Sequence, residues 1–408
     1  MTSADFALPP SPRVWRWDDF VLDSARYQLR CGDIEIRVEP QVFDVLTHLV
    51  RHSERFVTKE ELFDTVWGGR FVGEAALTSR IKAVRRALGD DGESQRYIRT
   101  IRGRGYQFVG SLRPGPDGAA NPPAPDRDVP RQHIAFTRAA DGARLAYSVC
   151  GAGPPLVRAA NWMTHLGYDV ESPVWRHWVR DMSARHTFVR YDERGCGLSD
   201  WAVDGFTFAD WVSDLESVVE AAGLERFALL GVSQGGAVAV AYAARHPGRV
   251  TRLVLCGAYA AGRAVRAHTP DEKRAAALDL DLARVGWGRD DPAFRQVFAA
   301  QFLPDGSRAD WAAFDQLQRR TTSPENAVRF LEEFGRVDVR DLCDRIRCPT
   351  LVLHSRDDHR VPLRCGEELA ALIPGADLVT LASNNHLLTG AEPAWQVFCA
   401  EVEAFLAA

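Results

Sequence analysis

A serine flanked by glycines lies between two predicted regular elements near the middle of the chain. Residues 231–235 read Gly-Val-Ser-Gln-Gly, after the apolar, strand-like segment 226–232 and before a run of small residues typical of a helix. Glycines two positions before and two positions after Ser233 permit the sharp strand-to-helix turn that exposes a nucleophilic hydroxyl. The N-terminus of the following helix favours the negative charge that develops during acyl transfer. The segment therefore predicts a serine nucleophile rather than a chance glycine-rich pattern.

A serine hydroxyl needs a base and a carboxylate that orients the base, and both follow later in the chain. The segment "PTLVLHSRDDHRVP" places Asp357 and Asp358 just after a predicted strand. Asp358 is the preferred carboxylate because of its spacing from the small Ser355, and Asp357 is the alternative. His386 follows one further predicted strand, and it alone of the eleven histidines fits this order. We therefore predict a catalytic triad of Ser233, Asp358 and His386.

A second group of residues with chemical potential lies near the N-terminus, on a predicted helix within residues 73–92. One face is apolar at helical spacing: Leu77, Ile81, Val84 and Leu88. The other face and its flanks are polar or basic: Ser79, Arg80, Lys82, Arg85 and Arg86. A hairpin-like segment at 96–110 then brings Arg102 and Arg104 to its turn. A helix can lie in the major groove and a hairpin tip can reach phosphates or the minor groove, so these residues predict DNA binding.

The charge distribution favours the same interpretation. Residues 70–104 hold nine Lys and Arg against four Asp and Glu, in a chain whose formal net charge is −5. A basic segment on an otherwise acidic protein indicates a local anionic partner. The alternative is a merely solvated basic helix face, but the hairpin at the appropriate distance favours DNA binding.

The rest of the composition excludes several other classes of protein. The chain is 46% hydrophobic and 26% charged, which is typical of a globular protein. Its eight cysteines are scattered without Cys-x-x-Cys or a His/Cys cluster, so no disulfide framework, metal site or cofactor is predicted. No segment approaches the roughly 20 apolar residues of a membrane span, and the N-terminus lacks a signal-peptide pattern. We expect a cytoplasmic protein without a membrane partner.

A stretch rich in proline and glycine divides the chain. Residues 113–132 show no hydrophobic periodicity, which is typical of a semi-extended linker. This linker separates a small unit, residues 13–112, from a large unit, residues 133–408, in which strand-like and helical segments alternate. Such alternation predicts a parallel sheet covered by helices, with the chemistry at the carboxyl ends of the strands.

The small unit resembles the DNA-binding domain of OmpR/PhoB-type response regulators. The stretches that carry the resemblance are "FVLDSARYQLR", "LTSRIKAVRRALGDDG" and "YIRTIRGRGYQF". The resemblance implies an α+β winged helix-turn-helix fold whose third helix reads the major groove of double-stranded DNA, and a homodimer on repeated half-sites. Only twelve residues precede this unit where such regulators usually have a receiver domain, so aspartate phosphorylation is not the expected input.

The large unit resembles the α/β-hydrolase superfamily. The resemblance is carried by "YDERGCGLSD" at 191–200, by the "GVSQGG" turn and by the ordered triad. It implies an α/β fold with a mostly parallel, doubly wound sheet and a helical cap at about 260–345 that roofs the pocket. The serine nucleophile argues against the epoxide hydrolases and haloalkane dehalogenases of this superfamily, since they use aspartate.

The same resemblance implies an oxyanion hole made by the backbone amides of Gln234 and Trp162. The loop that carries the second amide reads Ala160-Asn161-Trp162, where many relatives have His-Gly-aromatic. Two roles are open for Asn161, which can supply a side-chain donor to the oxyanion or hydrogen-bond its own loop. Trp162, Trp175 and Trp178 are expected near the pocket mouth, which favours an apolar site.

These expectations combine into a one-component transcriptional regulator. Its hydrolase-like part is expected to bind a small, largely apolar ester, lactone or related ligand, and either binding or slow hydrolysis is expected to change how the winged helix engages DNA. The first alternative is a serine esterase or lactonase whose DNA-binding head serves only localisation or autoregulation. The second is a receptor whose triad is idle. The fused head argues against the first alternative, and the complete triad argues against the second.

Overall fold

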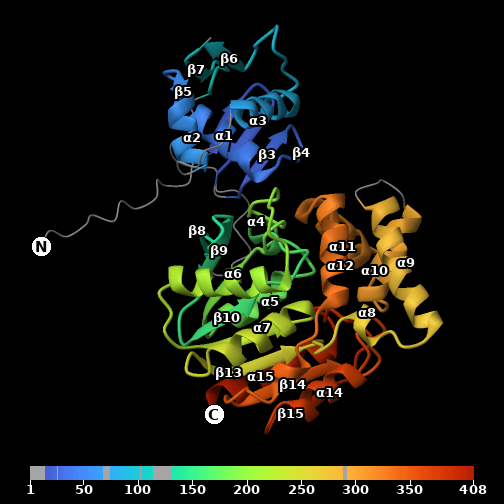
Figure 1. The fold of residues 1–408 in the computed structure, drawn as a ribbon. Helices are drawn as coiled ribbons and strands as arrows, with labels where there is room; N and C mark the ends of the chain where they lie inside the picture. The colour runs from blue at the N-terminus through green and yellow to red at the C-terminus, as the bar shows by residue number, and fades with distance from the viewer. Residues whose placement is uncertain (1–13, 25, 68–73, 102, 114–130, 288–291) are drawn as a thin grey trace, which may run out of the picture. The chain divides into compact units, whose positions relative to one another are not determined.

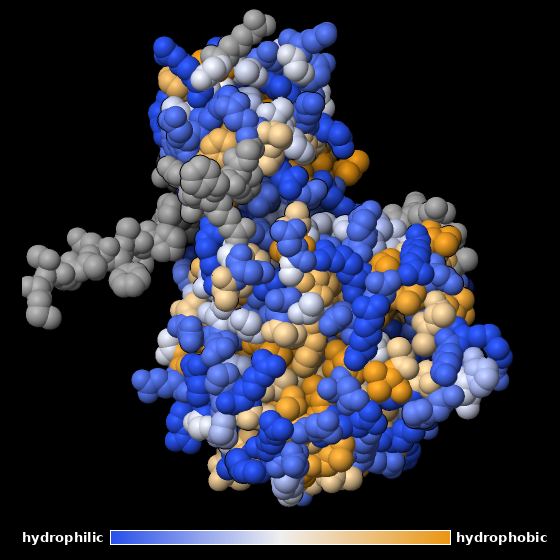
Figure 2. Space-filling view, in the orientation of Figure 1, coloured by the Kyte–Doolittle hydropathy of each residue, from blue (hydrophilic) through white to orange (hydrophobic). Residues whose placement is uncertain are grey.

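The computed structural model describes residues 14–24, 26–67, 74–101, 103–113, 131–287 and 292–408. It forms two compact units, Met1–Pro123 and Ala124–Ala408, and each is described by itself (Figure 1). On the face shown in Figure 2, hydrophilic residues cover most of the smaller unit, whereas hydrophobic residues show in several places on the larger one.

The smaller unit contains two small antiparallel sheets and a group of helices. The first sheet has the order β1-β2-β3-β4 and the second has the order β5-β7-β6. The strands are β1 Val14–Trp17, β2 Phe20–Asp23, β3 Gln28–Cys31, β4 Ile34–Ile36, β5 Val57–Thr58, β6 Ile98–Ile101 and β7 Gly105–Phe108. The helices are α1 Pro40–Arg51, α2 Lys59–Trp67 and α3 Glu74–Ala87. The α+β fold predicted from the sequence is confirmed.

The helices of this unit form because their apolar residues recur at helical spacing. Proline at the first turn of α1 presets the backbone angle of the helix and forgoes a hydrogen bond that the first turn cannot make. Helix α3 buries Leu77, Ile81 and Val84 and packs against α1. The opposite face of α3 is therefore left to solvent.

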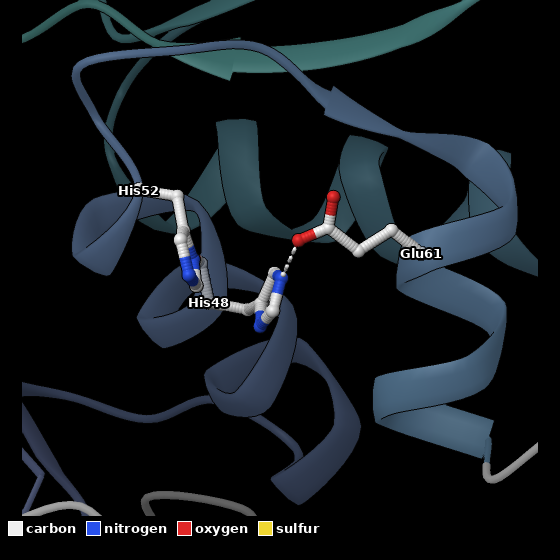
Figure 3. Close-up of side chains that lie close together, drawn as sticks. All are labelled: His48, His52 and Glu61. Carbon is white, nitrogen blue, oxygen red and sulfur yellow. Dashed lines mark hydrogen bonds and ion pairs between the residues drawn. The ribbon is translucent and has the colours of Figure 1, made fainter.

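A small polar group joins α1 to α2 (Figure 3). His48 Nε2 lies 2.9 Å from Glu61 Oε1, and Arg55 donates to both Glu61 oxygens at 2.7 and 2.8 Å. The hydrogen bonds from Arg55 lower the pKa of Glu61 to about 2, and burial lowers the pKa of His48. Glu61 is therefore ionised at neutral pH and held on both sides.

The larger unit is built on an eight-stranded sheet of order β15-β14-β13-β12-β10-β11-β9-β8. Strand β9 runs antiparallel to both of its neighbours, and the other pairs are parallel. The strands are β8 His133–Arg138, β9 Arg144–Cys150, β10 Pro155–Ala159, β11 Thr187–Tyr191, β12 Phe227–Val232, β13 Val250–Cys256, β14 Thr350–Ser355 and β15 Asp377–Leu381. The mostly parallel α/β sheet predicted from the sequence is confirmed.

Helices flank this sheet (Figure 1). They are α4 Leu166–Asp169, α5 Arg176–Ser183, α6 Phe208–Ala221, α7 Gln234–Arg245, α14 Arg364–Leu372 and α15 Pro393–Ala407. Strands β12 and β14 are buried at every position, as expected for central parallel strands. Helix α7 consists largely of alanine, glycine and valine, which lets it pack closely against β12, β10 and β13.

A segment of helices separates β13 from β14, and we call residues 263–343 the helical insertion. Its helices are α8 Arg263–Arg266, α9 Pro270–Gly286, α10 Pro292–Phe302, α11 Arg308–Thr321, α12 Pro324–Arg336 and α13 Arg340–Cys343. Helices α9 and α11 each begin with a capping box, from Thr269 and Ser307 respectively. The insertion is tied to the sheet unit by a bridge between Ala261 and Asp338.

Candidate active site

Ser233 lies in the tight turn between β12 and α7. Its backbone has φ 52° and ψ −125°, a conformation that costs energy for a residue other than glycine. The turn is held because Ser233 N–H donates to Cys256 O at 2.9 Å. A Cβ on Gly231 would lie 2.6 Å from Gly236 Cα, and one on Gly235 would lie 2.7 Å from Ala160 O. The glycines are therefore required by close backbone approach on both sides of the serine.

The structure brings Ser233, His386 and Asp358 into one hydrogen-bonded line. His386 Nε2 lies 2.8 Å from Ser233 Oγ, and His386 Nδ1 lies 2.7 Å from Asp358 Oδ2. These are the contacts that a general base needs to take a hydroxyl proton and to be oriented by a carboxylate. Asp358 is buried, whereas Asp357 is exposed. The imidazole is thus held by Asp358 and not by its neighbour.

Backbone donors fix the Asp358 carboxylate. Its Oδ1 accepts from the N–H groups of Arg360 and Val361 at 2.8 and 2.9 Å. Burial by itself would raise the pKa of the Asp358 carboxyl, but His386 and these donors hold that pKa below its ordinary value. Asp358 is therefore an anion at neutral pH, as a group that orients a histidine must be.

A second histidine lies close to this carboxylate without joining the line. His354 is fully buried in β14, its Nε2 donates to Val361 O at 2.7 Å, and burial lowers its pKa. Its Nε2 lies 3.9 Å from Asp358 Oδ2, beyond hydrogen-bond range. His354 is a neutral residue that supports the loop after β14.

The two residues predicted to form the oxyanion hole follow adjacent strands. Strands β10 and β12 pair in parallel with Ala159 opposite Gly231, so the loop after β10 begins beside the turn that carries Ser233. Gln234 is the first residue of α7, where backbone N–H groups have no partner within the helix. Trp162 lines the same pocket as Ser233 and Gln234. Strand order around β10 changes direction at this point, which is where ligands bind in open α/β sheets.

The side chain of Asn161 hydrogen-bonds its own loop. Its Nδ2 donates to Trp162 O at 3.1 Å, and its Oδ1 accepts from the Arg158 guanidinium. Arg158 is buried, stacks over the Trp175 ring at 4.0 Å, and has its pKa lowered to about 9 by burial. Of the two roles left open for Asn161, the structure shows the structural one.

Gln234 has a buried partner that the sequence did not reveal. Its Nε2 donates to Glu193 Oε1 at 2.8 Å, and burial raises the pKa of Glu193 well above its ordinary value. A neutral Glu193 thus holds the Gln234 side chain from within the turn after β11. Glu193 lies in the segment 191–200, which carries part of the family resemblance, but nothing in the local sequence indicated that its side chain faces α7.

Comparison with known protein families accounts for this arrangement. A family profile described as the alpha/beta hydrolase fold matches residues 166–390, more than half of the chain. The chain belongs to the α/β hydrolase family. A second profile, described as the C-terminal part of transcriptional regulatory proteins, matches residues 33–108 and identifies the smaller unit as a DNA-binding regulator domain.

Individual relatives of the hydrolase unit include enzymes of several kinds. The "Putative carbamate hydrolase RutD" of Escherichia coli is 26% identical over 249 residues, covering 59% of this chain and 89% of that protein. A hydrolase from Pseudomonas aeruginosa PA01 superposes with a TM-score of 0.56 at 27% identity, covering 68% of this chain and 99% of its own. The esterase RhEst1 from Rhodococcus sp. ECU1013 superposes with a TM-score of 0.54 at 26% identity, covering 67% of this chain and 98% of its own. An enol-lactonase from Burkholderia xenovorans LB400 superposes with a TM-score of 0.50 at 25% identity, covering 67% of this chain and 100% of its own.

The hydrolase pocket has a volume of about 400 Å³ and is shared between the sheet loops and the helical insertion. Its apolar lining includes Trp162, Tyr259, Phe302, Leu331 and Phe334. It also contains five cationic side chains, Arg263, Arg266, Lys273, Arg336 and Arg360, against the two acidic residues Asp279 and Glu332. The wall is thus mostly apolar, as expected from the sequence, and it also contains charged side chains, which the sequence did not indicate.

Two of the three tryptophans expected near the pocket mouth lie elsewhere. Trp162 lines the pocket and stacks on Trp287 at 5.3 Å. Trp175 and Trp178 are 1% and 0% exposed, and Trp178 packs against the α15 residue Trp395 at 4.7 Å. Placement of Trp175 and Trp178 at the mouth was wrong, because α5 turns these rings into the core between helices.

The predicted DNA-binding residues of α3 fall into two groups. Ser79, Lys82 and Arg86 are exposed. Arg80 donates to Gln41 Oε1 at 3.1 Å, and Arg85 donates to Ile98 O and Thr100 Oγ1, both at 2.8 Å. Arg80 and Arg85 are thus engaged within their own unit, and Arg85 joins α3 to the β6–β7 hairpin. Arg104 is exposed at the hairpin turn, and Arg102 lies outside the described residues.

Within the described residues, one group offers ligand atoms close enough to hold a metal ion, namely His48, His52 and Glu61 (Figure 3). Both Glu61 oxygens already accept hydrogen bonds from Arg55, so a cation would compete with a guanidinium. Hydrogen bonds within the smaller unit are enough to explain why His48, His52 and Glu61 lie close together, without a metal ion. No helix among the described residues is long and apolar enough to cross a membrane.

Proposed function

We propose that this protein is a one-component transcriptional regulator whose hydrolase unit binds and hydrolyses a small ester or lactone. The observation that carries the proposal is the hydrogen-bonded line from Asp358 through His386 to Ser233, in a chain that also contains a DNA-binding regulator domain. Similarity to an esterase and to an enol-lactonase supports acyl transfer to water as the reaction class.

The geometry supports the following sequence of steps. Ser233 Oγ attacks the acyl carbonyl carbon while its proton passes to His386 Nε2, 2.8 Å away. The imidazolium is stabilised by the Asp358 carboxylate, and the carbonyl oxygen becomes an oxyanion facing the amides of Gln234 and Trp162. His386 then protonates the leaving alkoxide as the carbon–oxygen bond breaks. Water, deprotonated by the same imidazole, releases the acid and restores the Ser233 hydroxyl.

On the DNA side, we propose that α3 lies in the major groove. Ser79, Lys82 and Arg86 are exposed on the face of α3 opposite its buried apolar line, which suits contact with base edges and phosphates. Arg104 at the hairpin turn, together with Arg102, would reach the flanking backbone or minor groove as a wing does. Arg80 and Arg85 act mainly by positioning α3. The regulator is proposed to act as a dimer on repeated half-sites.

A promoter reporter in cells tests the proposal most directly. We expect the wild-type protein to shift output from its own promoter in response to an ester or lactone that it hydrolyses. If Ser233→Ala binds the compound and the response survives, binding is the signal; if the response is lost, hydrolysis is the signal. If output ignores every hydrolysed compound while esterase activity is normal, the protein is instead an esterase whose head serves localisation or autoregulation.

A further inference from the structure

Three arginines converge inside the cavity that contains Ser233. Arg263 and Arg266 come from α8, in the helical insertion, and Arg360 comes from the loop after β14. The guanidinium groups of Arg263 and Arg360 both donate to Asp279 Oδ2, the latter at 2.5 Å. Arg266 lies over the Tyr259 ring at 5.2 Å and donates to the sulfur of Cys365. One carboxylate, Asp279, thus contacts two of the three guanidinium groups.

The charges of this arginine cluster are only partly compensated. The three guanidinium groups have one carboxylate among them, that of the buried Asp279, which accepts from two of them, and Arg360 also donates to Gln301 Oε1 at 2.7 Å. The other acidic residue of the cavity, Glu332, accepts from Arg284, which does not line the cavity. Over all lining residues, five cationic side chains stand against two acidic ones, but two of the five, Lys273 and Arg336, are exposed to solvent.

Burial makes the excess positive charge of the arginine cluster costly unless an anion completes it. The side chain of Arg360 is 12% exposed, whereas that of Arg263 is 38% exposed, and its partial burial lowers the pKa of Arg263. Cations withdrawn from water require compensation by an opposite charge or by hydrogen bonds. A planar guanidinium presents paired donors that match the two oxygens of a carboxylate. The cavity is therefore preorganised for a ligand that brings its own negative charge.

The position of Arg360 sets where that charge would lie relative to the reacting bond. Its guanidinium lies over the Phe302 ring at 5.0 Å, and the Phe302 ring lies 5.6 Å from the His386 ring. One aromatic ring thus separates the cation from the imidazole. The backbone N–H of the same residue donates to Asp358 Oδ1. An anion at the cluster would accordingly be several bonds distant from an acyl carbon placed at Ser233.

We propose that Arg263, Arg266 and Arg360 bind a carboxylate on the acyl chain of the substrate, so that the preferred ligand is a half-ester or lactone of a dicarboxylic acid. This inference rests on the proposed hydrolytic function of Ser233. It replaces the apolar ligand expected from the sequence by an amphipathic one, with its chain along Phe302 and its anionic end among the arginines.

The test compares two esters of equal length in the full-length protein. Mono(4-nitrophenyl) adipate ends in a carboxylate, and 4-nitrophenyl 5-carbamoylpentanoate ends in a neutral amide of similar shape. We expect kcat/KM for the adipate to exceed that for the amide by about tenfold or more, mainly through KM, because charge-assisted hydrogen bonds are the stronger kind. The preference should shrink as ionic strength rises.

Substitutions then locate the preference. Arg266→Gln and Arg263→Gln should each reduce the ratio of the two kcat/KM values at least about threefold. Arg274→Gln is the matched control, since Arg274 is exposed on α9 and does not line the cavity. An equal rate for both esters in the wild type, or a ratio that none of the cluster variants alters, would overturn the proposal. A preference for a phosphate-ended ester over the adipate would also overturn the assignment of a carboxylate.

A binding measurement separates this proposal from the hydrolytic one. Calorimetry of Ser233→Ala with monomethyl adipate and with methyl 5-carbamoylpentanoate needs no turnover. Tighter binding of the adipate, lost in Ser233→Ala/Arg266→Gln, supports the anion site even if the wild type hydrolyses neither nitrophenyl ester. Equal binding of the two compounds, or binding of neither, contradicts it.

Discussion

The two units of this protein present their functional groups in opposite ways. In the regulator unit, Ser79, Lys82 and Arg86 are exposed on a single helix. The residues with which this helix packs on the core are a different, apolar set on its opposite face. In the hydrolase unit, the proposed nucleophile and base are 153 residues apart in sequence and meet only in the folded sheet. The exposed face of α3 can be altered without disturbing the fold, whereas the Ser233–His386 arrangement exists only while the sheet is folded. This contrast predicts how substitutions in each unit should behave.

The largest effect is expected at the proposed nucleophile. Ser233→Ala should lower kcat for any hydrolysed ester by at least about 10³-fold, because the remaining donors and binding contacts cannot replace the nucleophile. Stopped-flow or steady-state assays with a 4-nitrophenyl ester measure this change. Thermal unfolding should be nearly unaltered, because alanine keeps the Cβ at this positive-φ position and only the hydroxyl group is lost. Residual activity close to wild type would remove Ser233 from the mechanism.

Next in size is a substitution that disturbs the turn without removing a reacting group. Gly235→Ala places a Cβ 2.7 Å from the carbonyl oxygen of Ala160, at the start of the loop that carries Trp162. We expect kcat to fall about 10- to 100-fold, since the two oxyanion donors would be pushed apart. Gly248→Ala is the control, because its added Cβ meets nothing within 4 Å. If both variants retain full activity, the spacing of the loops is not what sets the rate.

A smaller effect is expected on the regulator surface. Lys82→Ala and Arg86→Ala should each weaken binding to the promoter about five- to tenfold and reduce its salt dependence, without a change in melting temperature. Arg85→Ala should lower both affinity and stability, because it loses hydrogen bonds to Ile98 and Thr100. Arg30→Ala, on β3, serves as the control in the same gel-shift or anisotropy titration. A uniform response of all four variants would contradict the division of the basic residues into exposed and engaged groups.

The smallest predicted effect concerns the contact between His48 and Glu61, which joins α1 to α2. Because the pKa of Glu61 is lowered to about 2, its contribution to stability is present above the unfolded pKa near 4.5 and is lost as pH falls toward 2. Glu61→Gln should therefore destabilise α1 by less than about 1 kcal/mol at pH 7, since the group is partly exposed. Hydrogen exchange of the α1 amides, compared between the two proteins at each pH, measures the difference. If the difference in exchange between the two proteins grew below pH 4 instead of disappearing, the predicted pH dependence would be wrong.

The same contrast explains how far the sequence could be interpreted. Helical periodicity is local, so the buried line of Leu77, Ile81 and Val84 was readable, as was the mostly parallel sheet. The order of Ser233, Asp358 and His386 could be proposed because each follows a predicted strand. By contrast, nothing local indicates that Arg85 turns back to β6, or that Trp178 packs on Trp395.

The pocket lining was the least predictable part. Arg263, Arg266 and Arg360 meet across about 95 residues of sequence, and each looks by itself like one more surface arginine. Asn161 could not be assigned, although its partner Arg158 is only three residues earlier in the chain, because nothing in β10 indicated that this strand carries a buried cation. The meeting of the three arginines depends on tertiary packing, and the Asn161 contact depends on the burial of Arg158, and neither can be inferred from residue spacing.

The helical insertion has a consequence for how such proteins diversify. The groups proposed to perform the chemistry come from loops of the sheet, whereas most of the cavity's charged side chains come from one continuous segment, residues 263–343. We therefore expect mutations confined to that segment to change which molecule the cavity binds, while leaving the proposed acyl transfer and the proposed DNA contacts untouched. If the proposed sensing role holds, related proteins would acquire new ligands in this way, by drift in a single stretch of the gene.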